Sequence, residues 1–342
     1  MDVVTRGVST WTLGGALVVA TEVPAMRYLA FFLVGLLFCG CGGSSETSPI
    51  LNQGGPTFPP LVITLENAVH IHEDIDELSV PSGRNSVELA GGDLSRIEID
   101  GVAAVLVEMP LAYFILSQGT SQTFPGPGGG SAQLVVDPET ITVNFLQFVT
   151  QDGTRLNGTA VMRGEVEDVV NHIGDISATF TALEVADSDG VFQIDGPVTL
   201  GIHRTLTAQG YVERIERTQN ATIRDLTNGG SVRFINGDTI ATITVENDRQ
   251  SGSAVTSGSF LFDNYDGLSG LLTRVPLEDY LFSVDHTTHI STVTSGQSLL
   301  EGDGTIRLTV VAPDMIETAV RPSGGSEFVV VEVKDITDVD AD

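Results

Sequence analysis

Residues 176–182, Ile-Ser-Ala-Thr-Phe-Thr-Ala, alternate apolar side chains with hydroxyl side chains. The same period of two recurs at residues 198–203 and at residues 305–310. In a β-strand successive side chains point to opposite faces, so this spacing predicts strands with one buried face. We therefore expect Ala182 to share a buried face with Phe180.

Turn dipeptides are spread along the same chain. Asp-Gly begins at positions 100, 152, 189, 195, 266 and 303, and Asn-Gly at 157, 228 and 236. Both dipeptides accept positive φ and suit tight hairpins. No helix-length amphipathic run is found, although residues 65–80 fit a strand and a helix equally well. The pattern predicts an all-β protein, an antiparallel meander of many hairpins in an elongated or sandwich-like sheet.

The composition bounds the function. The 342 residues carry 16 Lys and Arg against 45 Asp and Glu, a formal net charge of −29. Such a charge repels phosphate backbones, so we expect no nucleic-acid partner. The only cysteines are Cys39 and Cys41, so the rest of the chain can form no internal disulfide and no thiolate zinc site.

Residues 26–41 have the order of a secretory signal: Arg27, an apolar run over residues 29–38, and then Gly40-Cys41. The closing pair resembles the lipobox of bacterial lipoproteins, which implies that Cys41 receives the lipid and anchors the protein in a bilayer. By the same resemblance, Gly42 in place of Asp after the lipidated residue favours the outer membrane or the cell surface. An uncleaved span is the alternative, but a span needs about 20 apolar residues.

The chain divides by composition. We expect an upstream extension or long leader at 1–25, the signal peptide at 26–40, a flexible Gly/Ser/Pro tether at 41–60, a smaller β-rich part at 61–121, a Pro/Gly-rich break at 122–131, the main β body at 132–334 and an acidic tail at 335–342.

Two clusters carry ligand types that divalent cations accept. On a strand, His70 and His72 would share one face with Asp74 next in line, a spacing that lets imidazole and carboxylate meet at one metal ion. Asp187 and Asp189 precede a glycine, as carboxylates do in calcium loops. The alternatives are a solvated strand edge for the first cluster and a plain acidic turn for the second.

No nucleophile motif, phosphate loop or dinucleotide fingerprint is found, so we do not expect an enzyme. We expect a lipid-anchored cell-envelope protein whose β body has a structural role or binds an envelope protein or a glycan. Cofactors are expected to be absent, with a divalent cation as the alternative. The competing functions are a metal- or calcium-dependent binding module and, behind it, an envelope hydrolase.

Overall fold

A computed structural model gives the structure of the protein. It describes residues 58–71, 120–151, 153–168, 173–187, 190–246, 249–284 and 291–335, with residues 102, 105, 106, 109, 110 and 114. The expected leader and signal peptide, the expected lipidation site Cys41, tether residues 41–57 and the acidic tail beyond residue 335 lie outside this part of the chain. The last tether residues, 58–60, are described, and Pro60 forms a bridge to Leu271.

In the described part of the chain, a single antiparallel sheet of 15 strands forms the body. The strands are β1 (Gln122–Pro125), β2 (Gly129–Val136), β3 (Ile141–Val149), β4 (Arg155–Asp168), β5 (Ile173–Ala186), β6 (Val191–Leu206), β7 (Gly210–Gln219), β8 (Thr222–Asp225), β9 (Ser231–Glu246), β10 (Arg249–Tyr265), β11 (Leu268–Val284), β12 (Ser291–Gly302), β13 (Gly304–Ala312), β14 (Met315–Pro322) and β15 (Val329–Asp335). The predicted all-β antiparallel meander is confirmed, as one sheet rather than a sandwich.

Neighbours in sequence are neighbours in the sheet, with one variation between β6 and β9. There β7 pairs with both strands, and the short β8 also pairs with both. The two short strands therefore occupy one position in the sheet, interrupted at residues 220 and 221. At the interruption, the Asn220 amide donates a hydrogen bond to the Pro197 carbonyl of β6 at 2.9 Å.

The buried face follows the predicted alternation over most of each strand. Ile176 and Phe180 on β5 are buried, and so are Ile306 and Leu308 on β13. The prediction that Ala182 is buried is wrong, because a β-bulge shifts the register of β5 against β6 after Phe180. Ala182 adopts a φ of 45° and is exposed, and the next residue takes the buried position instead.

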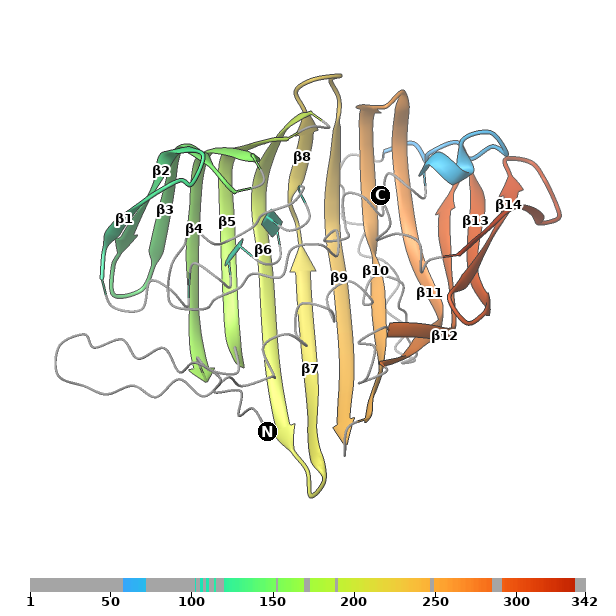
Figure 1. Ribbon diagram of the computed structural model, residues 1–342. Coiled ribbons are helices and arrows are strands. Elements are labelled where there is room, and N and C mark those ends of the chain that lie inside the picture. The colour runs from blue at the N-terminus through green and yellow to red at the C-terminus, as the bar shows by residue number, and fades with distance from the viewer. Residues whose placement is uncertain are drawn as a thin grey trace, which may run out of the picture.

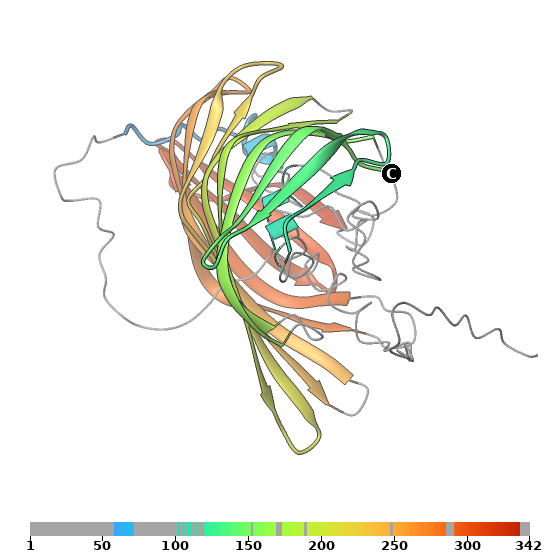
Figure 2. The same ribbon diagram turned by 90° about the vertical axis from the view of Figure 1, so that its left-hand side faces the viewer.

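The predicted turn dipeptides differ in whether they lie between strands or inside them. Those at 228, 266 and 303 lie between consecutive strands, as predicted. Asp100, Asp152 and Asp189, which begin three others, lie outside the described residues. Those at 157, 195 and 236 lie inside β4, β6 and β9, so for them the hairpin prediction is wrong. The register shift between Asn157 and Thr159 shows that the first of these is a bulge. Bulges bend and twist strands, and the sheet is strongly curved (Figure 2).

The concave side of this sheet holds the core. We call the face that carries Ile176 and Leu200 the inner face, and the opposite, convex side the outer face. Short helical pieces near residues 102–114 lie on the concave side (Figure 2). Their buried residues Val105, Leu106 and Met109 belong to the same apolar cluster as the inner-face residues of the strands.

An extended segment, residues 59–63, crosses the ends of several hairpins (Figure 1); we call it the N-terminal strap. The Leu61 amide donates to the Leu271 carbonyl at 2.8 Å, and the Asp303 amide donates to the Leu61 carbonyl at 2.7 Å. The Ile63 amide in turn donates to the Asp303 carbonyl at 2.9 Å. Because Leu61 and Ile63 are also fully buried, the strap ties β11 to the β12–β13 turn.

Within the described residues between 61 and 121 there are isolated bridges and helical residues but no strand. The other residues of this part lie outside the described ones, so its β-rich character stays a prediction. The buried helical residues Val102, Val105, Leu106 and Met109 recur three and four positions apart, a helical pattern missed in the sequence. The Pro/Gly-rich stretch 122–131 is no break, because it contains β1 and the start of β2. No helix within the described ranges is long and apolar enough to cross a membrane.

Candidate functional site

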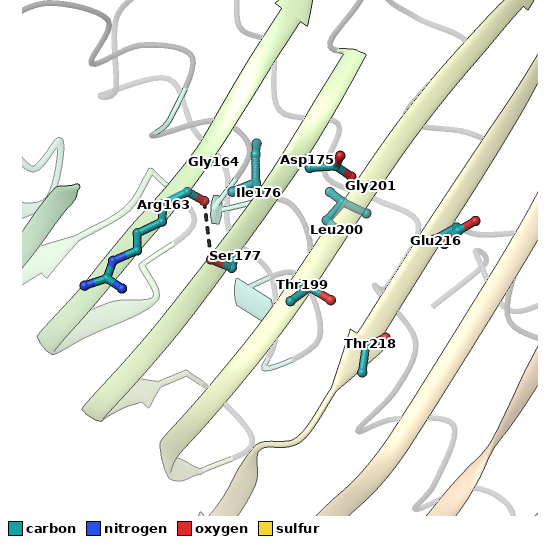
Figure 3. A pocket seen from close by; sticks show the side chains of 10 residues that line it. All are labelled: Arg163, Gly164, Asp175, Ile176, Ser177, Thr199, Leu200, Gly201, Glu216 and Thr218. Atoms are coloured by element: carbon teal, nitrogen blue, oxygen red, sulfur yellow. Dashed lines mark hydrogen bonds between the residues drawn. The ribbon is translucent and has the colours of Figure 1, made fainter. Parts of the chain in front are cut away.

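A shallow depression of about 300 Å³ crosses four neighbouring strands, β4 to β7 (Figure 3). Six of its ten lining residues have polar side chains; the ten are Arg163, Gly164, Asp175, Ile176, Ser177, Thr199, Leu200, Gly201, Glu216 and Thr218. Ile176 and Leu200 are buried, so their side chains belong to the inner face. The polar side chains alternate with them and therefore lie on the outer face.

One wall of the depression is a row of directly paired residues. Arg163 pairs with Ser177, Ser177 with Thr199, and Thr199 with Thr218. Directly opposite residues in an antiparallel sheet share a face, so these four side chains stand in line on the outer face. The Ser177 hydroxyl also donates to the Arg163 carbonyl at 3.4 Å (Figure 3).

The next row contains the gap that makes the depression. Asp175 pairs with Gly201, and Gly201 pairs with Glu216. A Cβ on Gly201 would lie 2.5 Å from Asp175 Oδ1 and 3.2 Å from His203 Nε2. Gly201 has no positive φ, so its backbone conformation does not require glycine, and the Asp175 carboxylate occupies the space beside it. The carboxylates of Asp175 and Glu216 therefore flank a strip of backbone at Gly201, which is itself buried.

Mixed charges surround this strip. His203 Nε2 lies 3.3 Å from Asp175 Oδ1, with 46% and 73% of the two side chains exposed. Glu216 forms an exposed ion pair with Arg214. Exposed pairs of this kind contribute little to stability, on the order of 0–1 kcal/mol. The charged side chains are therefore available for hydrogen bonds with a bound molecule.

The arrangement suits recognition by hydrogen bonding. Hydroxyl groups, carboxylates and one guanidinium converge on an open surface, and no aromatic side chain lines it. The described residues contain no group of three or more His, Cys, Asp or Glu side chains placed to hold a metal ion. The depression can offer donors and acceptors to a hydroxylated ligand, and nothing in its lining resembles a nucleophile held by a base.

The predicted metal ligands are not brought together. His70 lies in a short helical turn, residues 68–71, rather than on the strand assumed for the metal site. Its imidazole contacts the Asp266 carboxylate at the β10–β11 turn. His72 and Asp74 lie outside the described residues.

The predicted calcium turn shows a local role for one carboxylate. Asp187 Oδ1 accepts a hydrogen bond from the Gly190 amide at 3.1 Å, and the Asp187 amide donates to the Gly190 carbonyl at 3.0 Å. Asp187 thus caps the hairpin between β5 and β6, as aspartate commonly does in turns. Asp189 lies outside the described residues.

The inner face carries charged residues that the sequence analysis missed. Arg204 and Glu213 form a bidentate ion pair, with 13% and 3% of their side chains exposed. Arg217 is also buried, and loss of hydration lowers its pKa to about 10. The register of the hairpin could have revealed this pair in the sequence. Arg204 and Glu213 are equidistant from the β6–β7 turn, so they become direct cross-strand partners.

Comparisons with known proteins found no match to this chain. No protein-family model matches the sequence, and neither curated proteins nor solved structures give a match.

Proposed function

We propose that this chain is a lipid-anchored cell-envelope protein whose sheet binds an extracytoplasmic glycan at the outer face of β4–β7. The anchor is Cys41, which the lipobox-like end of the signal segment supplies. The observation that carries the binding role is the Gly201 depression, a shallow hollow in which six polar side chains lie around the Gly201 backbone. Sugar hydroxyls need donors and acceptors together, and these side chains offer both.

The depression favours a glycan over a protein partner because of its chemistry. Central regions of protein interfaces are apolar and rich in aromatic side chains. The depression has six polar side chains and no aromatic side chain in its lining, and its open shape suits a ligand that lies along the surface. Recognition would rest on hydrogen bonds and on bridging water rather than on ring stacking.

Filling the depression tests the binding role. Gly201→Val should remove binding, because its branched side chain occupies the gap between Asp175 and Glu216. The fold should tolerate it, since the closest atoms are the ends of exposed side chains that can move. Thr242→Val is the matched control, on the outer face of β9, where it does not line the depression.

Binding is measured on an array of purified bacterial envelope polysaccharides, with circular dichroism as the folding check. We expect at least a tenfold loss of glycan-binding affinity for Gly201→Val and no loss for Thr242→Val. Equal glycan binding by Gly201→Val and wild type would refute the site. Binding of an envelope protein in place of any glycan would favour a protein partner.

The anchor is tested separately. Cys41→Ala removes the only group that a lipobox lipidates, and stable anchoring generally needs more than one acyl chain. The variant should appear in the soluble fraction or as unprocessed precursor. If Cys41→Ala still incorporates labelled palmitate and fractionates with membranes as wild type does, the anchor assignment is wrong.

A further inference from the structure

The first described residues of the chain expose several apolar side chains. Residues 58–65, Phe-Pro-Pro-Leu-Val-Ile-Thr-Leu, contain no charged side chain, although the net charge of the whole chain is −29. The exposed fractions are 37% for Phe58, 51% for Val62 and 45% for Leu65. We call these three side chains the strap surface. Apolar surface left exposed on a folded body marks a site for another protein or for a membrane.

The backbone of this stretch is largely satisfied by hydrogen bonds. Its two prolines have no amide hydrogen. The Leu61 and Ile63 amides donate to carbonyls of the sheet, and the Val62 carbonyl accepts a hydrogen bond from the Asn67 side-chain amide at 3.0 Å. An unpaired backbone group is costly in a lipid environment. Because these groups have partners, the stretch can enter the surface of a bilayer at little cost.

The place of the strap surface in the chain indicates what covers it. Sixteen residues, 42–57, separate Phe58 from Cys41, and a Gly/Ser-rich chain of that length has an r.m.s. span of about 20–24 Å. The sheet is longer, since the 16 residues of β6 span about 53 Å. The strap lies at the upper end of the sheet and the β6–β7 turn at the lower end (Figure 1). A bilayer that holds Cys41 would therefore lie nearer to the strap surface than to the β6–β7 turn.

We propose that the strap surface inserts its three side chains into the bilayer that holds the lipidated Cys41. This insertion rests on the proposed anchor, because the anchor gives the strap a high effective concentration at the membrane, so that weak apolar insertion is enough. Charge favours the same end of the body. Anionic head groups repel a strongly acidic body, whereas residues 58–65 are neutral.

Insertion of the strap surface would orient the sheet relative to the membrane. β6 runs from the strap end toward the lower end of the sheet (Figure 1), and Gly201 lies ten residues beyond Val191, the first residue of β6. The Gly201 depression would then lie about 33 Å along the strand from the end that meets lipid. At that height the depression is clear of the head groups and faces extracytoplasmic glycans.

Fluorescence quenching tests the insertion in the lipidated full-length protein. Lipidation blocks the Cys41 thiol and removal of the signal peptide removes Cys39, so an introduced cysteine is the only free thiol. Val62→Cys carries an environment-sensitive fluorophore, and the vesicles are zwitterionic phosphatidylcholine with bromine on the acyl chains. Bromine quenches at short range, so only a fluorophore that enters the hydrocarbon edge is affected. Leu206→Cys is the matched control, because Leu206 is 80% exposed and lies at the far end of β6.

Quenching should be at least three times stronger at Val62→Cys than at Leu206→Cys. Circular dichroism should show both variants folded, because both positions are exposed. Equal quenching at the two positions, or no quenching at Val62→Cys in vesicle-bound protein, would overturn the proposal. Protection of Val62→Cys from a water-soluble thiol reagent in whole envelopes but not in vesicles would also overturn it, in favour of an envelope protein. Protein that neither incorporates palmitate nor floats with vesicles would instead refute the anchor, and the insertion with it.

A charge placed on the strap surface supplies an independent test, with the fluorophore on Leu65→Cys. Val62→Glu should weaken quenching at least threefold, because a carboxylate resists transfer into lipid. Leu206→Glu should leave quenching unchanged, although it alters the net charge by the same amount. If both substitutions weaken quenching equally, overall repulsion rather than insertion explains the effect. If Val62→Glu has no effect, Val62 does not enter the bilayer and the proposal is wrong.

Discussion

Glu213 on β7 accepts two hydrogen bonds from the Arg204 guanidinium on β6, 2.9 Å from Nε and 2.6 Å from Nη2. The guanidinium carbon of Arg204 also lies 4.1 Å from the centre of the Tyr211 ring. The two charged residues are nearly buried on the inner face. Because the Arg204 guanidinium satisfies the buried Glu213 carboxylate, removing the arginine takes away the cation that compensates it.

Arg204→Met should therefore be strongly destabilising, by about 3–5 kcal/mol. The double variant Arg204→Met, Glu213→Leu should recover most of the loss, because apolar residues of similar size replace a buried ion pair at little cost. Urea denaturation midpoints measure the stability of the single and the double variant. A double variant no more stable than Arg204→Met would show that the pair is not an energetic unit.

Glu213 should also give the protein a measurable pH dependence. Burial raises its pKa above the ordinary value of 4.5, and the hydrogen bond from Arg204 only partly opposes this. The folded state therefore binds the proton more tightly than the unfolded chain, so this stabilisation is present at low pH and is lost as pH rises through the raised pKa.

The pH effect is measured as a difference between wild type and Glu213→Gln, which cancels the many other carboxylates. The free energy of unfolding of wild type relative to Glu213→Gln should fall as pH rises from 4.5, and level off above the raised pKa. A difference that stays constant or grows with pH across this range would contradict the raised pKa.

The sequence predicted the strands because alternation is local. Val198, Leu200 and Ile202 follow it and are buried as expected. A β-bulge interrupts this alternation, and its position depends on the pairing with the neighbouring strand, which is not a local property of the sequence. Ala182 was expected to be buried, but it is exposed, and its backbone amide donates a hydrogen bond to the Asp195 carboxylate of β6 at 2.8 Å.

The Gly201 depression could not be predicted because it depends on register. Gly201 is a gap only when Asp175 on β5 and Glu216 on β7 lie on either side of it. Those pairings are not apparent from local periodicity. The His70 cluster failed for a related reason, because residues 65–80 fit a helix as well as a strand, and His70 lies in a helical turn.

Arg274 should be a destabilising residue. It lies on β11 with 3% of its surface exposed, and its Nη2 has no hydrogen-bond partner in the described part of the chain. Burying a charge without a partner costs free energy. Arg274→Met should raise stability by about 1–4 kcal/mol, measured by urea denaturation.

Arg233→Met is the matched control for Arg274→Met. Arg233 is exposed on β9, so its replacement should change stability by less than about 0.5 kcal/mol. If Arg274→Met destabilises the protein as a core truncation would, the guanidinium contributes stabilising interactions and the prediction is wrong.

The N-terminal strap provides the last prediction. Leu61 is 2% exposed and its neighbour Val62 is 51% exposed, so two adjacent strap positions differ almost entirely in burial. Leu61→Ala should cost about 2–5 kcal/mol, and Val62→Ala should cost less than about 0.5 kcal/mol. The strap also packs so closely that a Cβ on Gly302 would lie 2.3 Å from the Leu61 carbonyl oxygen.

Hydrogen exchange locates the effect of Leu61→Ala. The Leu271 amide donates to the Pro59 carbonyl and the Asp303 amide donates to the Leu61 carbonyl, so both amides are protected by the strap alone. Loosening the strap should speed exchange at these two amides before it affects the centre of the sheet, because local opening exposes only the bonds that it breaks. Uniform acceleration across the strands would mean that Leu61 stabilises the whole sheet rather than the docking of the strap.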